Sequence, residues 1–392
     1  MTEHIFDIHG LLGLRVVGTD ADVALVRRQL GPLPDAVSPR PADLTIRFVD
    51  ELVCGPLTLL GRREFAFDAD ELVVLRGKHK TPVRVRLPLA SLQGGEVVVQ
   101  RGAPSIPYLV ALLNLLVLGN GGLALHAAAF EHRGAGVVVT GWSKGGKTEC
   151  LLAMLGDGAR YVGDEWILLD GEGRMAGGLA EPVRVWDWYL AQLPQLRRNV
   201  PRPDRLRLAA LRVVDGAAGA IAERFPVAPV RRVAGRAAHT IDGQRHVDLA
   251  ADRLNHDGST GLRVRFDVLV HAVSTASTAH ELVAIDPVEV ADRMAASLAY
   301  ERRPLLDLYD AFRYAFPGRR CALIESAASI ERARLRQLFT GRPTFELRHP
   351  YPPDLDRLRQ LLGDLEPSAP TCVQPCGDAP SSAVAPGRDV QP

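Results

Sequence analysis

The nine residues from 141 to 149, GWSKGGKTE, constrain this chain more than any other stretch. They contain the pattern G-x-x-x-x-G-K-[ST], which is met by Gly141, Gly146, Lys147 and Thr148. An apolar run over residues 136–140 precedes the pattern, and a helix-forming run that extends to Leu155 follows it. The sequence therefore predicts a strand, a glycine-rich loop and a helix that begins near residue 147.

Such a loop has a specific use in phosphate binding. Its glycines let successive backbone N–H groups turn inward around an anion, and the helix N-terminus adds the positive end of its dipole. Lys147 is expected to reach the β- and γ-phosphates, and the Thr148 hydroxyl is expected to bind Mg²⁺. We therefore expect ATP and Mg²⁺ as cofactors, held by Gly141, Trp142, Ser143, Lys144, Gly145, Gly146, Lys147 and Thr148. Trp142 either stacks on an adenine or covers the back of the loop.

The use of cations in the chain also points to this loop. The chain has 43 arginines and 4 lysines, and two of the lysines are Lys144 and Lys147. A compact ammonium enters a tight phosphate cradle more easily than a planar guanidinium does. Twelve of the arginines lie in residues 184–245, where prolines repeatedly break the sequence. This segment is predicted to be a helical insertion, either with a solvated basic face or as a lid or docking surface for an acidic substrate.

Composition and charge indicate which partners and which location to expect for the chain. With 392 residues, 47% hydrophobic residues and a net charge of +1, the chain gives no reason to expect nucleic acid or a membrane as partner. The longest apolar segment, residues 109–119, is too short to span a bilayer and favours a buried helix. No signal peptide is visible, and the five cysteines are scattered. A cytoplasmic location is therefore expected.

The first 105 residues form a β-rich region in this interpretation. A helix is expected at 20–30, and short apolar or alternating runs predict strands at 44–49, 64–67, 72–75, 83–87 and 96–99. Residues 106–365 are expected to form one α/β domain that carries the loop and the Arg-rich insertion. From residue 366 onward the chain is rich in Pro, Ser, Ala and Gly and is expected to be disordered.

Within residues 106–365, helices and β-runs alternate. Helices are expected at 105–118, 147–155, 287–299, 328–339 and 355–362. The expected β-runs are 123–130, 137–140, 160–169, the stretch after a turn at 170–173, 264–270, 321–324 and 344–348. The β-run 160–169 is expected to bend around Gly163, Asp164 and Glu165.

Residues 120 to 175 resemble the catalytic core of the HPr kinase/phosphorylase family. His126 lies on the strand before the loop, Glu149 follows Thr148 directly, and the acidic pair Asp164-Glu165 follows about 15 residues later. The resemblance implies an α/β fold with a P-loop HPr kinase-like, PEP-carboxykinase-like mixed sheet core, here with a β-rich N-terminal extension. It also implies that His126 contacts the transferred phosphate, and that Glu149 and Glu165 join Thr148 near the metal.

Three departures from the family bear on the expected site and activity. Glu165 stands where the family usually has a second Asp, and the family's Arg-Pro-Gly-Arg-Asn-type loop has only a loose echo at residues 229–235. The first 105 residues also differ from the family's usual N-terminal domain. Divergent relatives of this core act on other targets, including Ser residues of peptide natural-product precursors, and this chain looks more like that group.

The expected function is ATP-dependent transfer of the γ-phosphoryl group to a hydroxyl, with a Ser of a peptide or protein as acceptor and an acidic substrate as one candidate. Asp164 would be the general base that deprotonates the acceptor, or would bind Mg²⁺ through water; both roles stay open. A small-molecule kinase and a nucleotide-binding regulatory or scaffold protein without turnover are the alternatives. A homo-oligomer is compatible with the sequence.

Overall fold

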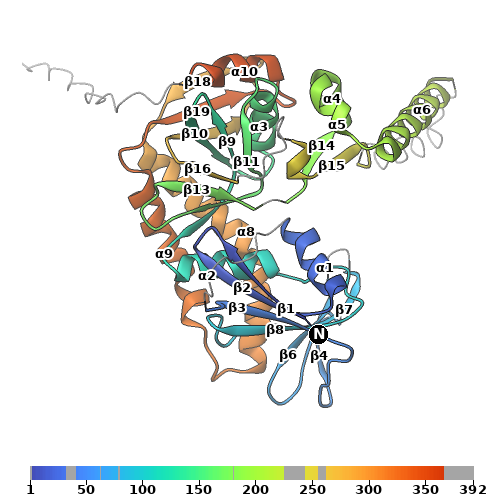
Figure 1. Ribbon diagram of the computed structural model, residues 1–392, viewed down its shortest axis with the longest axis vertical. Coiled ribbons are helices and arrows are strands. Elements are labelled where there is room, and N and C mark those ends of the chain that lie inside the picture. Colours follow the sequence, from blue (N-terminus) through green and yellow to red (C-terminus); the bar gives the residue numbers. More distant parts are fainter. Residues whose placement is uncertain are drawn as a thin grey trace, which may run out of the picture.

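A computed structural model describes residues 2–31, 41–61, 63–77, 80–179, 181–224, 243–254 and 262–365. These residues form a mixed α/β architecture with two large mixed sheets and one two-stranded sheet (Figure 1). In Figure 1 the sheet of strands β1–β8 lies below, and the sheet that contains the glycine-rich loop lies above it.

The first sheet takes up the N-terminal hundred residues. Its order is β1-β2-β3-β8-β7-β6-β5-β4, and α1 (Asp20–Leu30) joins β2 to the parallel strand β3. The strands are β1 (Thr2–Ile8), β2 (Leu12–Gly18), β3 (Leu44–Val49), β4 (Thr58–Leu60), β5 (Phe65–Phe67), β6 (Leu72–Arg76), β7 (Pro82–Arg86) and β8 (Gly95–Gln100). The five predicted strands and the predicted helix are confirmed within a residue or so at each end, whereas β1, β2 and β4 were not predicted.

The second sheet is mixed and has the order β16-β13-β12-β9-β10-β17-β19-β18, with β11 also paired to β9. The neighbouring pairs β10·β17 and β17·β19 are parallel, and the other described pairs of this sheet are antiparallel. The strands are β9 (Leu123–His132), β10 (Ala135–Gly141), β11 (Arg160–Gly163), β12 (Trp166–Leu169), β13 (Met175–Gly178), β16 (Arg263–Arg265), β17 (Val268–Ser274), β18 (Glu281–Ala284) and β19 (Thr344–His349).

Helices cover both faces of this second sheet. On one face α3 (Lys147–Leu155) and α10 (Leu355–Gly363) pack on the apolar side chains of β10 and β17. On the other face α2 (Leu109–Gly119), α8 (Pro287–Ala315) and α9 (Ala322–Phe339) belong to a buried apolar cluster that continues into the first sheet. The two sheets therefore share one hydrophobic core.

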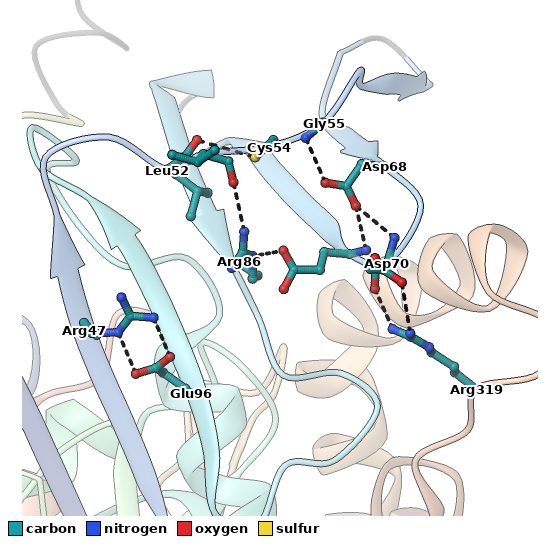
Figure 2. A network of polar contacts seen from close by, with 11 residues as sticks. Arg47, Leu52, Cys54, Gly55, Asp68, Asp70, Arg86, Glu96 and Arg319 are labelled. Atoms are coloured by element: carbon teal, nitrogen blue, oxygen red, sulfur yellow. Dashed lines mark hydrogen bonds and ion pairs between the residues drawn. The ribbon is translucent and has the colours of Figure 1, made fainter.

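The segment after α8 also touches the rim of the first sheet. The ring of Phe316 meets that of Phe67 edge-on, with ring centroids 5.9 Å apart. Figure 2 shows Arg319 beside Asp70, together with the polar network around Asp68 and Arg86. These contacts join the region between α8 and α9 to the turn between β5 and β6.

Two predicted β-runs differ from the structure. The strand predicted at 321–324 is wrong, because Cys321 caps α9 and residues 322–324 form its first turn. A four-residue apolar run does not separate strand from helix, and the burial of Ile324 and Ala327 at a spacing of three residues is helical. The run 264–270 is two strands, because β16 pairs with β13 whereas β17 pairs with β10, and the N–H groups of Phe266 and Asp267 donate to Arg174 and Gly136 where the chain passes from one partner to the other.

The remaining predicted elements of this half are present, but three helices have other bounds: the helix predicted at 105–118 begins at Leu109, the one at 328–339 begins at Ala322, and the one at 287–299 continues to Ala315. Strand β18 was not predicted. The Arg-rich insertion contains α4 (Asp187–Gln192), α5 (Pro194–Asn199) and α6 (Arg202–Arg224). These helices lie in the chain between the paired strands β14 (Val183–Trp186) and β15 (His246–Leu249). A short 3-10 helix at Ala251–Arg253 follows β15. In Figure 1, α6 projects away from the rest of the molecule. Residues 225–242 and the predicted tail 366–392 lie outside the described residues.

Among the described helices, none combines the length and apolar character that a membrane span requires.

Candidate functional site

The glycine-rich loop (residues 141–146) connects β10 to α3 and has a backbone that only small residues permit. Gly141 has φ 152° and Gly146 has φ 102°. A Cβ at Gly141 would lie 2.5 Å from the carbonyl oxygen of Ala272, and a Cβ at Gly146 would lie 2.1 Å from Nε2 of His349. Gly146 is the N-cap of α3 and offers no side chain to its N–H groups. The first turn of α3 is therefore left to bind an anion.

Lys147 lies across this loop. Its Nζ donates a hydrogen bond to the carbonyl oxygen of Trp142 at 3.0 Å, and the side chain is almost fully buried. Burial lowers the pKa of Lys147 below its usual value, against the attraction of Glu165 and Asp164. A cation held at the loop and surrounded by carboxylates is placed to neutralise a polyphosphate.

Asp164 contacts the start of α3 directly. The Thr148 hydroxyl donates to its carboxylate, at 2.9 Å from Oδ2 and 3.2 Å from Oδ1. The Asp164 side chain is only 4% exposed. Burial and the neighbouring charge of Glu165 raise the pKa of Asp164 to about 7. A carboxylate with a pKa near neutrality, beside a phosphate loop, suits a general base.

The chain leaves the β-ladder where the two acids occur. β11 pairs with β9 up to Gly163, β12 resumes the pairing at Trp166 opposite His126, and Asp164 and Glu165 lie between. Glu165 has φ 68°, a left-handed conformation that is uncommon for a non-glycine residue. Such strain is typical of functional sites, and here it turns two neighbouring carboxylates to different partners.

His126 is held between two carboxylates. Its Nε2 lies 3.0 Å from Oε2 of Glu165, and its Nδ1 lies 3.0 Å from Oε1 of Glu301, as an ion-pair contact without hydrogen-bond alignment. Burial of the ring opposes protonation, but Glu165 and Glu301 outweigh it and raise the pKa of His126 above its usual value. The ring of Trp166 stacks on His126. His126 therefore contacts Glu165 and Glu301, and the charges of the same two carboxylates act on Lys147.

The predicted metal-site residues do not share one cluster. Thr148 bonds to Asp164, Glu165 contacts His126, and Glu149 instead accepts a hydrogen bond from the Tyr189 hydroxyl at 3.0 Å. No group of three or more His, Cys, Asp or Glu side chains with metal-binding geometry occurs among the described residues.

Thr148 and Asp164 nevertheless fit a phosphate-bound Mg²⁺. Such an ion takes one or two protein oxygens beside water and phosphate oxygens. The Thr148 hydroxyl donates its proton to Asp164, which leaves the lone pairs of its oxygen for a cation.

Two residues of the site were not predicted as functional. Glu301 comes from α8, and the neighbours of the loop include His349 at the end of β19. The ring nitrogens of His349 lie 3.0 Å from the carbonyl oxygen of Gly145 and 2.7 Å from that of Pro350. One signal for Glu301 exists in the sequence, because Met294, Leu298 and Leu305 mark the buried stripe of α8 and Glu301 falls on that stripe.

The described arginines of the insertion differ in their partners, and Arg184 and Arg207 form surface ion pairs with Asp248 and Asp204. Arg212 and Arg245 bond to Asp187, whose side chain is buried, and thereby stabilise the insertion. Four others are exposed and form no ion pair with the described residues: Arg197, Arg198, Arg202 and Arg205. Some arginines therefore stabilise the insertion, and others give it an exposed basic surface.

No protein-family model matches the chain, and none of the curated proteins matches it either.

Proposed function

We propose that this chain is an ATP- and Mg²⁺-dependent kinase that transfers the γ-phosphoryl group to a hydroxyl, a Ser of a peptide or protein substrate. The observation that carries the proposal is the contact of Thr148 with a buried Asp164 whose pKa is about 7, beside Lys147. The loop, a cation and a poised carboxylate together meet the needs of phosphoryl transfer, which are charge neutralisation, alignment and a base.

Each residue has a role in this proposal. The N–H groups of the glycine-rich loop and Lys147 would bind the phosphates, and the Thr148 hydroxyl would hold the metal. Bound Mg²⁺ neutralises phosphate charge. Asp164 accepts the proton of the acceptor hydroxyl as the new P–O bond forms. His126, held by Glu165 and Glu301, presents its buried ring to the transferring phosphate.

The proposal includes the fold and the setting. The second sheet would be a phosphate-loop core of the HPr kinase and PEP-carboxykinase kind, with residues 1–105 as a β-rich extension. The place of the loop between β10 and α3, and of the acidic pair beside β9, supports this. The free thiols of Cys54, Cys150 and Cys321 fit the cytoplasm, where ATP is available. The unpaired arginines of α5 and α6 would attract an acidic substrate segment.

The test is transfer of label from γ-labelled ATP and Mg²⁺ to Ser-containing peptides and to a cell extract by the full-length protein. Lys147→Ala is expected to abolish labelling. Lys80→Ala, which changes a lysine outside the loop, is the matched control and is expected to retain labelling.

Two results would contradict the proposal. Labelling of a peptide by Lys147→Ala at the wild-type rate would exclude this loop as the site. If wild type binds ATP but labels nothing, the chain is a nucleotide-binding protein without turnover. Label in a small molecule instead of a peptide would keep the kinase and change its acceptor.

A further inference from the structure

Two aromatic side chains meet at the rim of the glycine-rich loop. Trp142 comes from the loop and is 50% exposed, and Tyr300 comes from α8 and is 56% exposed. Their ring centroids are 4.9 Å apart and their planes are tilted by 37°. Large aromatic rings kept half exposed and in mutual contact are typical of a binding surface rather than of a core.

The aromatic pair lies at one particular end of the site. The carbonyl oxygen of Trp142 accepts the hydrogen bond of Lys147 Nζ, so the backbone of Trp142 lies beside the group that reaches the β- and γ-phosphates. Tyr300 directly precedes Glu301, which contacts His126 at 3.0 Å. Trp142 and Tyr300 are therefore connected, through Lys147 and Glu301, to the residues that are proposed to surround the transferring phosphate.

The acidic residue after Thr148 has other aromatic neighbours. Glu149 accepts a hydrogen bond from the Tyr189 hydroxyl at 3.0 Å, and its charge also helps to raise the pKa of Tyr351, after the larger effect of burial. In the proposed complex the γ-phosphate lies at Lys147 and the nucleoside extends away from that lysine. We therefore assign the aromatic pair, which is connected to Lys147 and to Glu301, to the acceptor end of the site.

We propose that Trp142 and Tyr300 form an acceptor subsite that binds an apolar or aromatic side chain next to the Ser that receives the phosphate. This inference rests on the kinase function proposed above and names the class of its substrate. The carboxylates of Asp164, Glu165 and Glu301, which act on Lys147, disfavour an acidic residue at that position. An acidic segment that binds the arginines of α5 and α6 would belong to a more distant part of the same substrate.

The experiment uses the full-length protein and a set of short peptides that contain one Ser flanked by Phe, Leu, Ala, Asp or Lys. Initial rates with labelled ATP give kcat and KM for each peptide. We expect wild type to prefer Phe or Leu over Asp by roughly tenfold or more in kcat/KM, chiefly through KM. Tyr300→Ala and Trp142→Ala are expected to reduce this preference to within about twofold.

Three controls separate the subsite from a change in folding or nucleotide binding. Tyr300→Phe keeps the ring and is expected to keep the preference. Tyr314→Ala changes a more exposed tyrosine of the same helix and is expected to change nothing. The Kd values for ATP and for inorganic tripolyphosphate are expected to stay within about twofold of wild type in the Tyr300 and Tyr314 variants, because the proposal places the Tyr300 ring away from the base.

Each opposing outcome has a distinct meaning. If Tyr300→Ala weakens ATP binding but not tripolyphosphate binding, the pair holds the nucleobase and the inference is wrong. If wild type labels the peptides without preference, or the variants keep the preference, the inference fails while the kinase stands. If only a sugar or another small hydroxyl compound is labelled, the peptide subsite is overturned. If wild type labels no acceptor, the proposed function itself fails.

Discussion

Among the described residues of the first sheet and its helix α1, the one buried charged side chain is Asp22, whereas the second sheet and its flanking helices bury Lys147, Asp164, His126 and Glu346 among others. All acceptor contacts of Asp22 have a structural use, because it caps α1 through Thr19 and pairs with Arg101. Burying charge costs free energy unless partners compensate it. Glu346 of the second sheet is likewise paired, with Arg293 and Arg348, whereas structural pairing and capping give no account of the buried Lys147 and Asp164.

The largest expected effect is on phosphoryl transfer by Asp164→Asn. Loss of the base is expected to lower kcat on the order of 10³-fold, with ATP affinity kept within a few-fold. Because Asp164 must be ionised to accept a proton, the wild-type rate is expected to rise with pH as the carboxyl loses its proton and then to level off. Single-turnover transfer measured from pH 5.5 to 8.5 tests both statements.

Asp310→Asn, on the exposed face of α8, is the matched control for this variant and is expected to behave as wild type. Retention of more than a tenth of the activity by Asp164→Asn, with an unchanged pH profile, would show that Asp164 is not the base. The buried charge of Asp164 would then have no catalytic use, and its presence in the second sheet would lack an explanation.

A second effect concerns stability in buffer without metal or nucleotide. The pKa of Asp164 rises from 3.8 to about 7 on folding, so its protonated form is favoured in the folded protein. Its contribution to stability is fully present below pH 4 and is lost as the pH rises to about 7. This amounts to at most about 4 kcal/mol. Asp164→Asn, which keeps an acceptor for Thr148, is therefore expected to be more stable than wild type at pH 8 but not at pH 4.

Urea unfolding of both proteins at the two pH values measures this difference. A variant that is less stable than wild type at pH 8 would show that the ionised carboxylate stabilises the fold, as Asp22 does in the first sheet. The contrast between the two sheets would then disappear.

The local parts of the site could be predicted from the sequence. The loop, α3 and the bend at Asp164 are consecutive in the chain, and glycine spacing and apolar runs specify them. Glu301 and His349 come from elements far along the chain, and tertiary packing alone brings them to the loop. Their positions follow from how α8 and β19 pack, which no local pattern encodes.

The fold shows the same division. Strands with alternating or β-branched runs, such as β3 and β8, were predicted with nearly correct ends. The order in which they pair was not, because the parallel contact of β3 with β8 joins segments almost fifty residues apart. The error at residues 321–324 has a local cause, since four apolar residues suit a strand and a helical turn equally well.

A smaller effect is expected in the first sheet from Asp22→Ala. The change removes the reciprocal cap with Thr19 and the partner of Arg101, and it is expected to cost about 1–3 kcal/mol of the free energy of unfolding. Phosphoryl transfer at 25 °C is expected to be unchanged. Asp20→Ala, at an exposed position of the same helical turn, is the control and should cost less. If Asp22→Ala lowers transfer while the protein stays folded, the first sheet contributes to the site after all.

The smallest expected effect is that of the ion pair between Arg47 on β3 and Glu96 on β8, which Figure 2 shows as two contacts. The two nitrogen–oxygen distances are 2.8 and 2.7 Å. Both side chains are 40% exposed, so water screens their attraction. A double-mutant cycle with Arg47→Gln and Glu96→Gln is expected to give a coupling of about 0.2–1 kcal/mol that falls with added salt. A coupling above about 2 kcal/mol that resists salt would mean that the first sheet depends on its charged pairs. Surface ion pairs would then contribute to the stability of the first sheet as much as a buried charge does. The two sheets would differ only in that the second uses its buried charges for catalysis.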